Sequence, residues 1–116
     1  YEMWLEGNVV TKAGNDYLRY EEVQDEQTIR TTIKLTEQGT VILRNGAVKM
    51  RMPLSTEQRE IGHYESMYGA LPLETATYQL AIEQLNGSGR FTTNYDLIVA
   101  GNSVGNYTLD ITFTEV

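Results

Sequence analysis

The chain has 116 residues, no cysteine, and 16 acidic against 9 basic residues, which gives a formal net charge of -7. This length suits a single domain over residues 1–116, and the absence of thiols excludes disulfides, thiolate zinc sites and a cysteine nucleophile. The negative charge opposes binding to nucleic acid and to anionic membranes, and no apolar run approaches the roughly 18 residues of a membrane-spanning helix.

Apolar and polar residues alternate with a period of two along most of the chain, which predicts β-strands. The pattern is clearest near the C-terminus, where two alternating segments follow each other. The predicted strands, in chain order, are Met3 to Lys12, Tyr17 to Val23, Thr28 to Thr36, Thr40 to Arg44, Ala47 to Met52, Glu60 to Met67, Leu71 to Leu85, Arg90 to Val99 and Tyr107 to Thr114.

Turn-forming residues separate these segments at hairpin spacing. The segment Pro53 to Gln58 has room for at most one helical turn. A change of apolar parity in the long seventh strand predicts a bulge near Thr75 to Thr77. The predicted turns are Ala13 to Asp16, Glu37 to Gly39, Asn45-Gly46, a loose loop over Gly101 to Gly105, and Asn86 to Gly89, where Gly87 is expected at positive φ.

Together these features predict an all-β fold, an antiparallel up-and-down meander that closes into a barrel of about eight strands. The barrel would bury one face of each strand and leave the other face, with Thr92 and Asp96, in water. The C-terminal residues predicted to be buried together are Phe91, Tyr95, Leu97, Leu109, Ile111 and Phe113.

Three runs resemble the YwiB-like family: Arg44-Asn45-Gly46-Ala47-Val48-Lys49-Met50, Tyr20-Glu21-Glu22, and the segment from Tyr64 to Thr75. These are small bacterial proteins of unknown function with a calycin-like, that is lipocalin-like, β-barrel. The resemblance implies a cytoplasmic bacterial barrel and supplies no catalytic residues or cofactors. Because family members have about one further N-terminal strand, this chain is expected to lack it.

Residues that carry catalytic chemistry are scarce. His63 is the only histidine, and it is either a haem ligand or general base, or a surface residue on a strand. Its parity, out of phase with Tyr64, favours the surface. The adjacent acids Glu21 and Glu22 point to opposite faces of a strand, so they do not form a catalytic pair. No metal site, cofactor or catalytic residue is predicted.

Hydroxyl-bearing residues on the apolar parity of the strands are the candidate ligand-binding set. They are Tyr64, Tyr95, Tyr107, Thr31 and Thr93, interspersed with Ile29, Ile33, Val41, Leu97, Leu109 and Phe113. Such a lining is typical either of a small-molecule pocket or of a filled core. The predicted function is non-enzymatic, namely binding of a small hydrophobic ligand in the barrel or of a protein partner. The alternatives are an enzyme at the barrel mouth and a regulatory interaction module with a packed interior.

Basic residues are concentrated between Thr28 and Met52, a stretch of net charge +4 in a chain whose remainder is -11. Alternation sends Arg30, Lys34, Lys49 and Arg51 to the outer wall, and Arg44 is expected to join them. We hypothesise that this basic stripe docks an acidic protein partner. The alternative is that neighbouring acids neutralise it through cross-strand pairs. The oligomeric state is left open.

Overall fold

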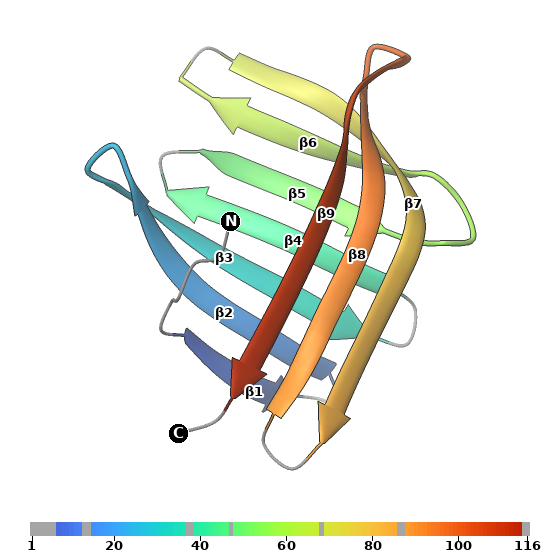
Figure 1. Cartoon of the computed structure of the whole chain (residues 1–116). Helices are drawn as coiled ribbons and strands as arrows, with labels where there is room; N and C mark the ends of the chain where they lie inside the picture. Colours follow the sequence, from blue (N-terminus) through green and yellow to red (C-terminus); the bar gives the residue numbers. More distant parts are fainter. Residues whose placement is uncertain are drawn as a thin grey trace.

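The computed structural model describes residues 7–12, 15–36, 39–46, 48–67, 69–85 and 88–114, which form one antiparallel sheet (Figure 1). Each strand pairs with the next in the chain, so the connections are hairpins or short loops. The strands are β1 (Gly7–Lys12), β2 (Asn15–Gln24), β3 (Gln27–Thr36), β4 (Gly39–Gly46), β5 (Lys49–Leu54), β6 (Glu60–Ser66), β7 (Gly69–Leu85), β8 (Ser88–Val99) and β9 (Asn102–Thr114).

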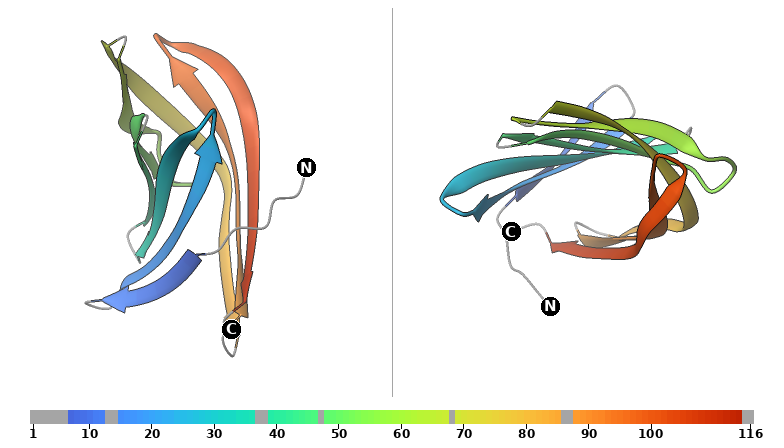
Figure 2. Two further views of the ribbon diagram at one scale, coloured as in Figure 1. Left: turned by 90° about the vertical axis from the view of Figure 1, so that its left-hand side faces the viewer. Right: turned by 90° about the horizontal axis from the view of Figure 1, so that it is seen from above.

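The predicted all-β antiparallel meander is confirmed, with nine strands. The long strands β7, β8 and β9 run across the face of β2 to β5, and the sheet curls on itself when viewed from above (Figures 1 and 2). Strands β1 and β9 are the two ends of the paired order, and no pairing joins them within the described residues. The described chain is therefore a curled half-barrel whose concave face holds the core.

The core forms where side chains of the two halves of the sheet meet. Leu18, Ile33, Ile42 and Met52 lie in one cross-strand row over β2 to β5, and all four are buried. Opposite them lie residues of β7 and β8, of which Phe91 is fully buried. Each fully buried side chain of this size contributes roughly 1.5–3 kcal/mol of transfer free energy.

The predicted register of the C-terminal strands is correct. Phe91 and Tyr95 are buried, and the other four predicted core residues are half-buried against the same cluster. Those four are less covered because three of them lie on β9, where the sheet ends. Thr92 and Asp96 are not in the buried set, as predicted.

One residue expected inside the barrel lies outside. In β4 the buried residues are Thr40 and Ile42, so Val41 lies on the outer face, where it pairs with Lys34. The segment Pro53 to Gln58, which had room for at most one helical turn, forms none, and its first two residues continue β5.

Two bulges adjust the long strands. In β7 the register shifts between Thr77 and Gln79, which places the extra residue at Tyr78, one position beyond the predicted range. A second shift, opposite the step from Leu97 to Ile98, leaves Val104 as an extra residue in β9. Next to this shift, the buried residue of β8 is Ile98 instead of Val99. Bulges bend and twist a strand, which is how β7 to β9 cross the other layer.

Gly62 allows β5 and β6 to approach closely. A Cβ at Gly62 would lie 2.1 Å from the carbonyl oxygen of Arg51 and 3.1 Å from the Pro53 ring. Beyond that point β7 replaces β6 as the neighbour of β5, since the Thr75 hydroxyl donates a 2.6 Å hydrogen bond to the Pro53 carbonyl. The contact closes one side of the core.

Two hairpins turn through two-residue loops in which both residues have positive φ, the pattern of a type I′ turn. Asp25 (φ 51°) and Glu26 (φ 65°) connect β2 to β3, and Ala100 (φ 53°) and Gly101 (φ 81°) connect β8 to β9. The last connection is thus a tight turn, because Asn102 to Gly105, expected in a loose loop, belong to β9. The predicted positive φ of Gly87 lies outside the described residues.

Replacing Glu26 with glycine is expected to raise the free energy of unfolding by about 0.5–1 kcal/mol, because it removes a side chain from a left-handed conformation and creates the preferred Asp-Gly turn. The matched control is Gly101→Ala at the same position of the other hairpin, which should lower stability by a similar amount. No atom lies within 4 Å of a Cβ at Gly101, so the cost would be conformational. Urea unfolding of both variants tests this, and a destabilised Glu26→Gly protein would contradict the turn assignment.

Candidate ligand sites on the inner face

The inner face of the half-barrel has two chemically different ends. One end lies at the β3–β4 and β5–β6 connections, and the other at the β2–β3, β4–β5 and β8–β9 connections. The buried side chains of Ile33 and Ile42 separate them along β3 and β4. We call the first the pocket end and the second the polar end.

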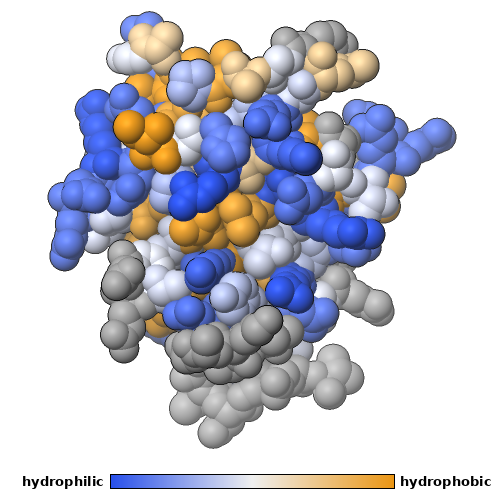
Figure 3. Space-filling view, turned by 180° about the vertical axis from the view of Figure 1, so that it is seen from behind, coloured by the Kyte–Doolittle hydropathy of each residue, from blue (hydrophilic) through white to orange (hydrophobic). Residues whose placement is uncertain are grey.

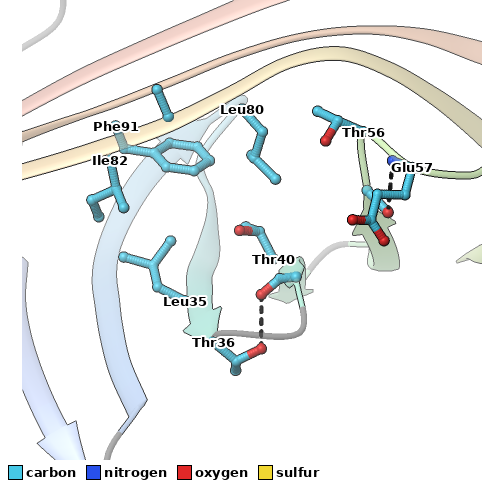
Figure 4. Close-up of a pocket in the computed structure, with 11 residues that line it drawn as sticks. Leu35, Thr36, Thr40, Thr56, Glu57, Leu80, Ile82 and Phe91 are labelled. Atoms are coloured by element: carbon cyan, nitrogen blue, oxygen red, sulfur yellow. Dashed lines mark hydrogen bonds between the residues drawn. The ribbon is translucent and has the colours of Figure 1, made fainter.

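The pocket end contains a pocket of about 520 Å³ (Figure 4). Its apolar wall is formed by Leu35 of β3, Leu80 and Ile82 of β7, and Phe91 of β8, whose side chains point into the same space (Figure 4). Its polar side consists of the facing ends of β3 and β4 and of the β5–β6 connection, with the residues Thr36, Gly39, Thr40, Ser55, Thr56 and Glu57.

Local hydrogen bonds hold this polar side. The Thr36 hydroxyl donates to the Gly39 carbonyl at 2.8 Å, and the Glu57 backbone N–H donates to the Ser55 hydroxyl at 3.2 Å (Figure 4). Among the described lining residues, Glu57 is the one with a titratable side chain. The pocket therefore combines an apolar wall with a few oriented polar groups, and a converging acid–base pair is not part of its described lining.

A charge pair lies at the polar end. The Arg44 guanidinium donates from Nη2 to Glu22 Oε1 at 2.8 Å, with 27% and 11% of the two side chains exposed. Both residues belong to the inner face: Arg44 pairs across the strands with buried Thr31, and Glu22 with buried Ile29. Arg44 therefore does not join the outer basic stripe, contrary to the expectation. Strand β4 buries Thr40 and Ile42, which places Arg44 on the same side.

Two tyrosines of β8 and β9 face this pair. Tyr95 is buried and stacks on Tyr107, with ring centroids 5.7 Å apart and an interplanar angle of 26°. Burial raises the pKa of Tyr95, the nearby Tyr107 and Tyr20 raise it further, and the positive charge of Arg44 lowers it. The phenol of Tyr95 thus lies within electrostatic reach of the row that carries Arg44.

All five residues predicted to bind a ligand lie in strands on the inner-face parity, and none lines the pocket. Thr31, Tyr64, Tyr95 and Tyr107 lie at the polar end. Thr93 is buried between the ends, and its hydroxyl donates to the Gln79 carbonyl at 2.9 Å. Sequence reasoning thus selected the inner face but not the pocket, and the role of these residues in binding stays a prediction.

Sequence reasoning missed the pocket and the position of the Arg44–Glu22 pair on the inner face. The signal for Arg44 was present: Thr40, Ile42 and Arg44 share one parity, but the adjacent apolar pair Ile42-Leu43 made either choice plausible. The pocket had no signal in the sequence, because its walls come from strands and connections far apart in the chain.

Comparison with known proteins shows the family to which this chain belongs. Residues 1–111 match the family described as a domain of unknown function, DUF1934. The chain belongs to the DUF1934 family. It is 29% identical over 107 residues to the uncharacterized beta-barrel protein YwiB of Bacillus subtilis strain 168, an alignment over 92% of this chain and 75% of that protein.

The crystal structure of the ywiB protein from Bacillus subtilis superposes on the DUF1934 chain with a TM-score of 0.79 and 28% sequence identity. The superposition covers 95% of this chain and 75% of that one. The resemblance to YwiB-like proteins is therefore confirmed, and the curled half-barrel of this chain is similar in fold to a beta-barrel protein. The descriptions of these relatives name no ligand, substrate or partner.

The outer wall of the DUF1934 domain mixes charged and apolar side chains (Figure 3). Arg30 forms a 3.2 Å ion pair with Glu21, and Lys49 lies across the strands from Glu65. Lys34 lies over the Tyr17 ring, at 5.9 Å from its centroid. With Arg44 on the inner face, the five residues of the predicted basic stripe do not form one continuous row. Their role in partner binding stays a prediction.

Other outer residues of the DUF1934 domain lie beside residues of the neighbouring strands or form hydrogen bonds with them. Exposed His63 lies on the outer face between Arg51 and Pro72. On β7 and β8, the Tyr78 hydroxyl donates a 2.5 Å hydrogen bond to Asp96, which lowers the pKa of Asp96 and raises that of Tyr78.

In the described part of the chain no cluster of three or more His, Asp or Glu residues is arranged to hold a metal ion, and no helix is long and apolar enough to span a membrane.

Proposed function

We propose that this DUF1934 protein binds a small hydrophobic ligand in the pocket of a calycin-like barrel. The observation that carries the proposal is the pocket itself: about 520 Å³, with Leu35, Leu80, Ile82 and Phe91 on one side and threonine and serine hydroxyls on the other. This volume and this mixture are typical of small-molecule sites, in which an apolar wall supplies affinity and a few polar groups orient the ligand.

Exposure at the mouth supports the proposal. Ile82 lines the pocket and keeps 42% of its surface exposed, although neighbouring Phe91 is fully buried. A ligand that covered Ile82 would remove apolar surface from water at about 25 cal/mol per Å². The alternative function, an enzyme at the barrel mouth, requires converging titratable groups, and Glu57 is the one such group in the described lining. Binding is the function that these residues support best.

The test uses the neutral dye Nile red, whose fluorescence rises in apolar surroundings. We expect it to bind the full chain, and Ile82→Gln to weaken binding by about tenfold, because an amide would replace a large part of the apolar mouth. The matched control is Ile61→Gln on the outer face of β6, where the side chain is 71% exposed and is not part of the lining of this pocket. Circular dichroism of each variant verifies the fold. Equal dye affinity in the Ile82→Gln and wild-type proteins would refute the proposed site.

Native mass spectrometry of protein purified from its own host would then identify the ligand. We expect a bound species of small-molecule mass that is retained by the Ile61→Gln protein and depleted in the Ile82→Gln protein. The same spectrum reports the number of subunits. A bound species that both variants retain equally would place the ligand elsewhere on the chain.

A further inference from the structure

The polar end carries hydroxyl groups that the fold does not use. The hydroxyls of Thr31 and Thr77 are buried, with 2% and 8% of these residues exposed, and neither has a hydrogen-bond partner in the described chain. No hydrogen bond between described residues uses the hydroxyl of Tyr64, Tyr95 or Tyr107. Leaving a buried hydroxyl without a partner costs about 1–3 kcal/mol, so native proteins usually avoid it.

Pairing between strands places these groups in two facing rows. The first row crosses β3 to β6 and contains Thr31, Arg44 and Tyr64, with Met50 between the last two. The second row crosses β7 to β9 and contains Thr77, Tyr95 and Tyr107. Tyr64 and Tyr95 both belong to the packing of the same core cluster. The unused hydroxyls therefore point toward the same inner face.

The charge balance at this end limits the chemistry of a ligand. Arg44 and Glu22 already neutralise each other at 2.8 Å, so the pair adds no net charge. An anionic ligand on Arg44 would lie beside the Glu22 carboxylate, and a cation on Glu22 would lie beside the guanidinium. An uncharged ligand avoids both repulsions. It can still accept a hydrogen bond from the guanidinium and donate one to the carboxylate.

We propose that the polar end is a second binding site, which takes an uncharged, polyhydroxylated small molecule. Sugar hydroxyls donate and accept hydrogen bonds, as the threonine and tyrosine hydroxyls do. The stacked rings of Tyr95 and Tyr107 offer an apolar surface for the C–H groups of the sugar. The site does not depend on the hydrophobic pocket, because Ile33 and Ile42 lie between the two ends.

Access to the site is from the solvent side of the same end. Arg44 and Tyr107 are partly exposed, whereas Thr31 and Thr77, which lie in the same two rows, are buried. A ligand that entered would meet the stacked tyrosine and the guanidinium first and the two unpartnered threonine hydroxyls last. The two buried threonine hydroxyls would gain the most from a ligand, because they would break no hydrogen bond within the described chain in order to bind it.

The test titrates the ¹⁵N-labelled full chain with four neutral sugars, namely D-glucose, D-galactose, D-mannose and N-acetyl-D-glucosamine, at millimolar concentrations. We expect at least one sugar to shift the amide signals of residues in both rows, and the anionic D-glucuronate to bind more weakly. The double variant Thr31→Val/Thr77→Val should lower the affinity for that sugar by at least about tenfold. It removes two hydrogen-bonding groups and keeps the shape of the side chains.

The melting temperature separates a binding role from a structural one. Because the Thr31 and Thr77 hydroxyls have no partner in the described chain, the double variant should melt at the same temperature as the wild type or higher. The matched control is Thr75→Val, which removes a hydroxyl that donates to the Pro53 carbonyl. It should lower the melting temperature and leave sugar affinity unchanged.

Three results would overturn the proposal. The first is that none of the four sugars shifts the signals of the two rows. The second is that the Thr31→Val/Thr77→Val protein keeps the wild-type affinity for the sugar that binds. The third is that this protein melts as low as the Thr75→Val control, which would mean that the two hydroxyls stabilise the fold through internal water.

Discussion

Replacing Phe91 with alanine is expected to lower the free energy of unfolding by about 3–5 kcal/mol, the usual cost of deleting a fully buried aromatic ring. Phe91 is 0% exposed and belongs to the central core cluster, and it also forms one wall of the pocket. The loss would combine the transfer free energy of the ring with the cost of the enlarged cavity. Urea unfolding at neutral pH measures it.

Phe113 is the matched control, because it is the only other phenylalanine and is half-buried on β9. We expect Phe113→Ala to cost about half as much, since a partly exposed side chain loses less transfer free energy. If Phe91→Ala abolishes folding, Phe91→Leu should keep the fold at a cost of up to about 1.5 kcal/mol. A Phe91→Ala protein as stable as Phe113→Ala would contradict the assignment of Phe91 to the centre of the core.

Replacing Arg44 with methionine is expected to lower stability by about 2 kcal/mol at neutral pH, because it removes the guanidinium that lies 2.8 Å from the largely buried Glu22 carboxylate. The value lies below the cost for a fully buried pair, about 3–5 kcal/mol, because Arg44 keeps 27% of its side chain exposed. Methionine retains most of the aliphatic packing of arginine, so the change reports mainly on the lost charge and hydrogen bond.

The double variant Arg44→Met/Glu22→Leu removes both charges and should recover most of this loss, to within about 1 kcal/mol of the wild type. The matched control is Arg30→Met, which breaks the pair with Glu21 on the outer wall, where the side chains are 73% and 61% exposed. That change should cost less than about 0.5 kcal/mol. Equal losses for Arg44→Met and Arg30→Met would contradict the placement of Arg44 on the inner face.

Alternation alone predicted most of the strands, because a strand with one buried face must repeat with period two. The segment from Arg90 to Val99 shows this well: Phe91, Thr93 and Tyr95 are buried, and the residues between them are not. The ends of strands were predicted less well. The Asp25-Glu26 turn has no glycine or asparagine, so its type I′ geometry could not be recognised from residue preference.

The candidate sites were predicted only in part. The tyrosine and threonine set marked the inner face because parity places whole rows of residues on one side of a strand. Parity failed where two apolar residues are adjacent, as at Ile42-Leu43, and the side of Arg44 followed from burial of Thr40 and Ile42 in the folded chain. The bulges at Tyr78 and Val104 likewise depend on how two strands pair.

The fold class, the antiparallel order of strands and the inner set of hydroxyl residues could be predicted without a structure, because they follow from local periodicity and from turns between neighbouring strands. The position of the pocket, the contact of Arg44 with Glu22, and the lack of a partner for the Thr31 and Thr77 hydroxyls in the described chain follow from the folded structure alone. These features arise where β2 to β5 face β7 to β9 across the curled sheet. The contacts that create them join residues distant in the chain, and no local pattern records them.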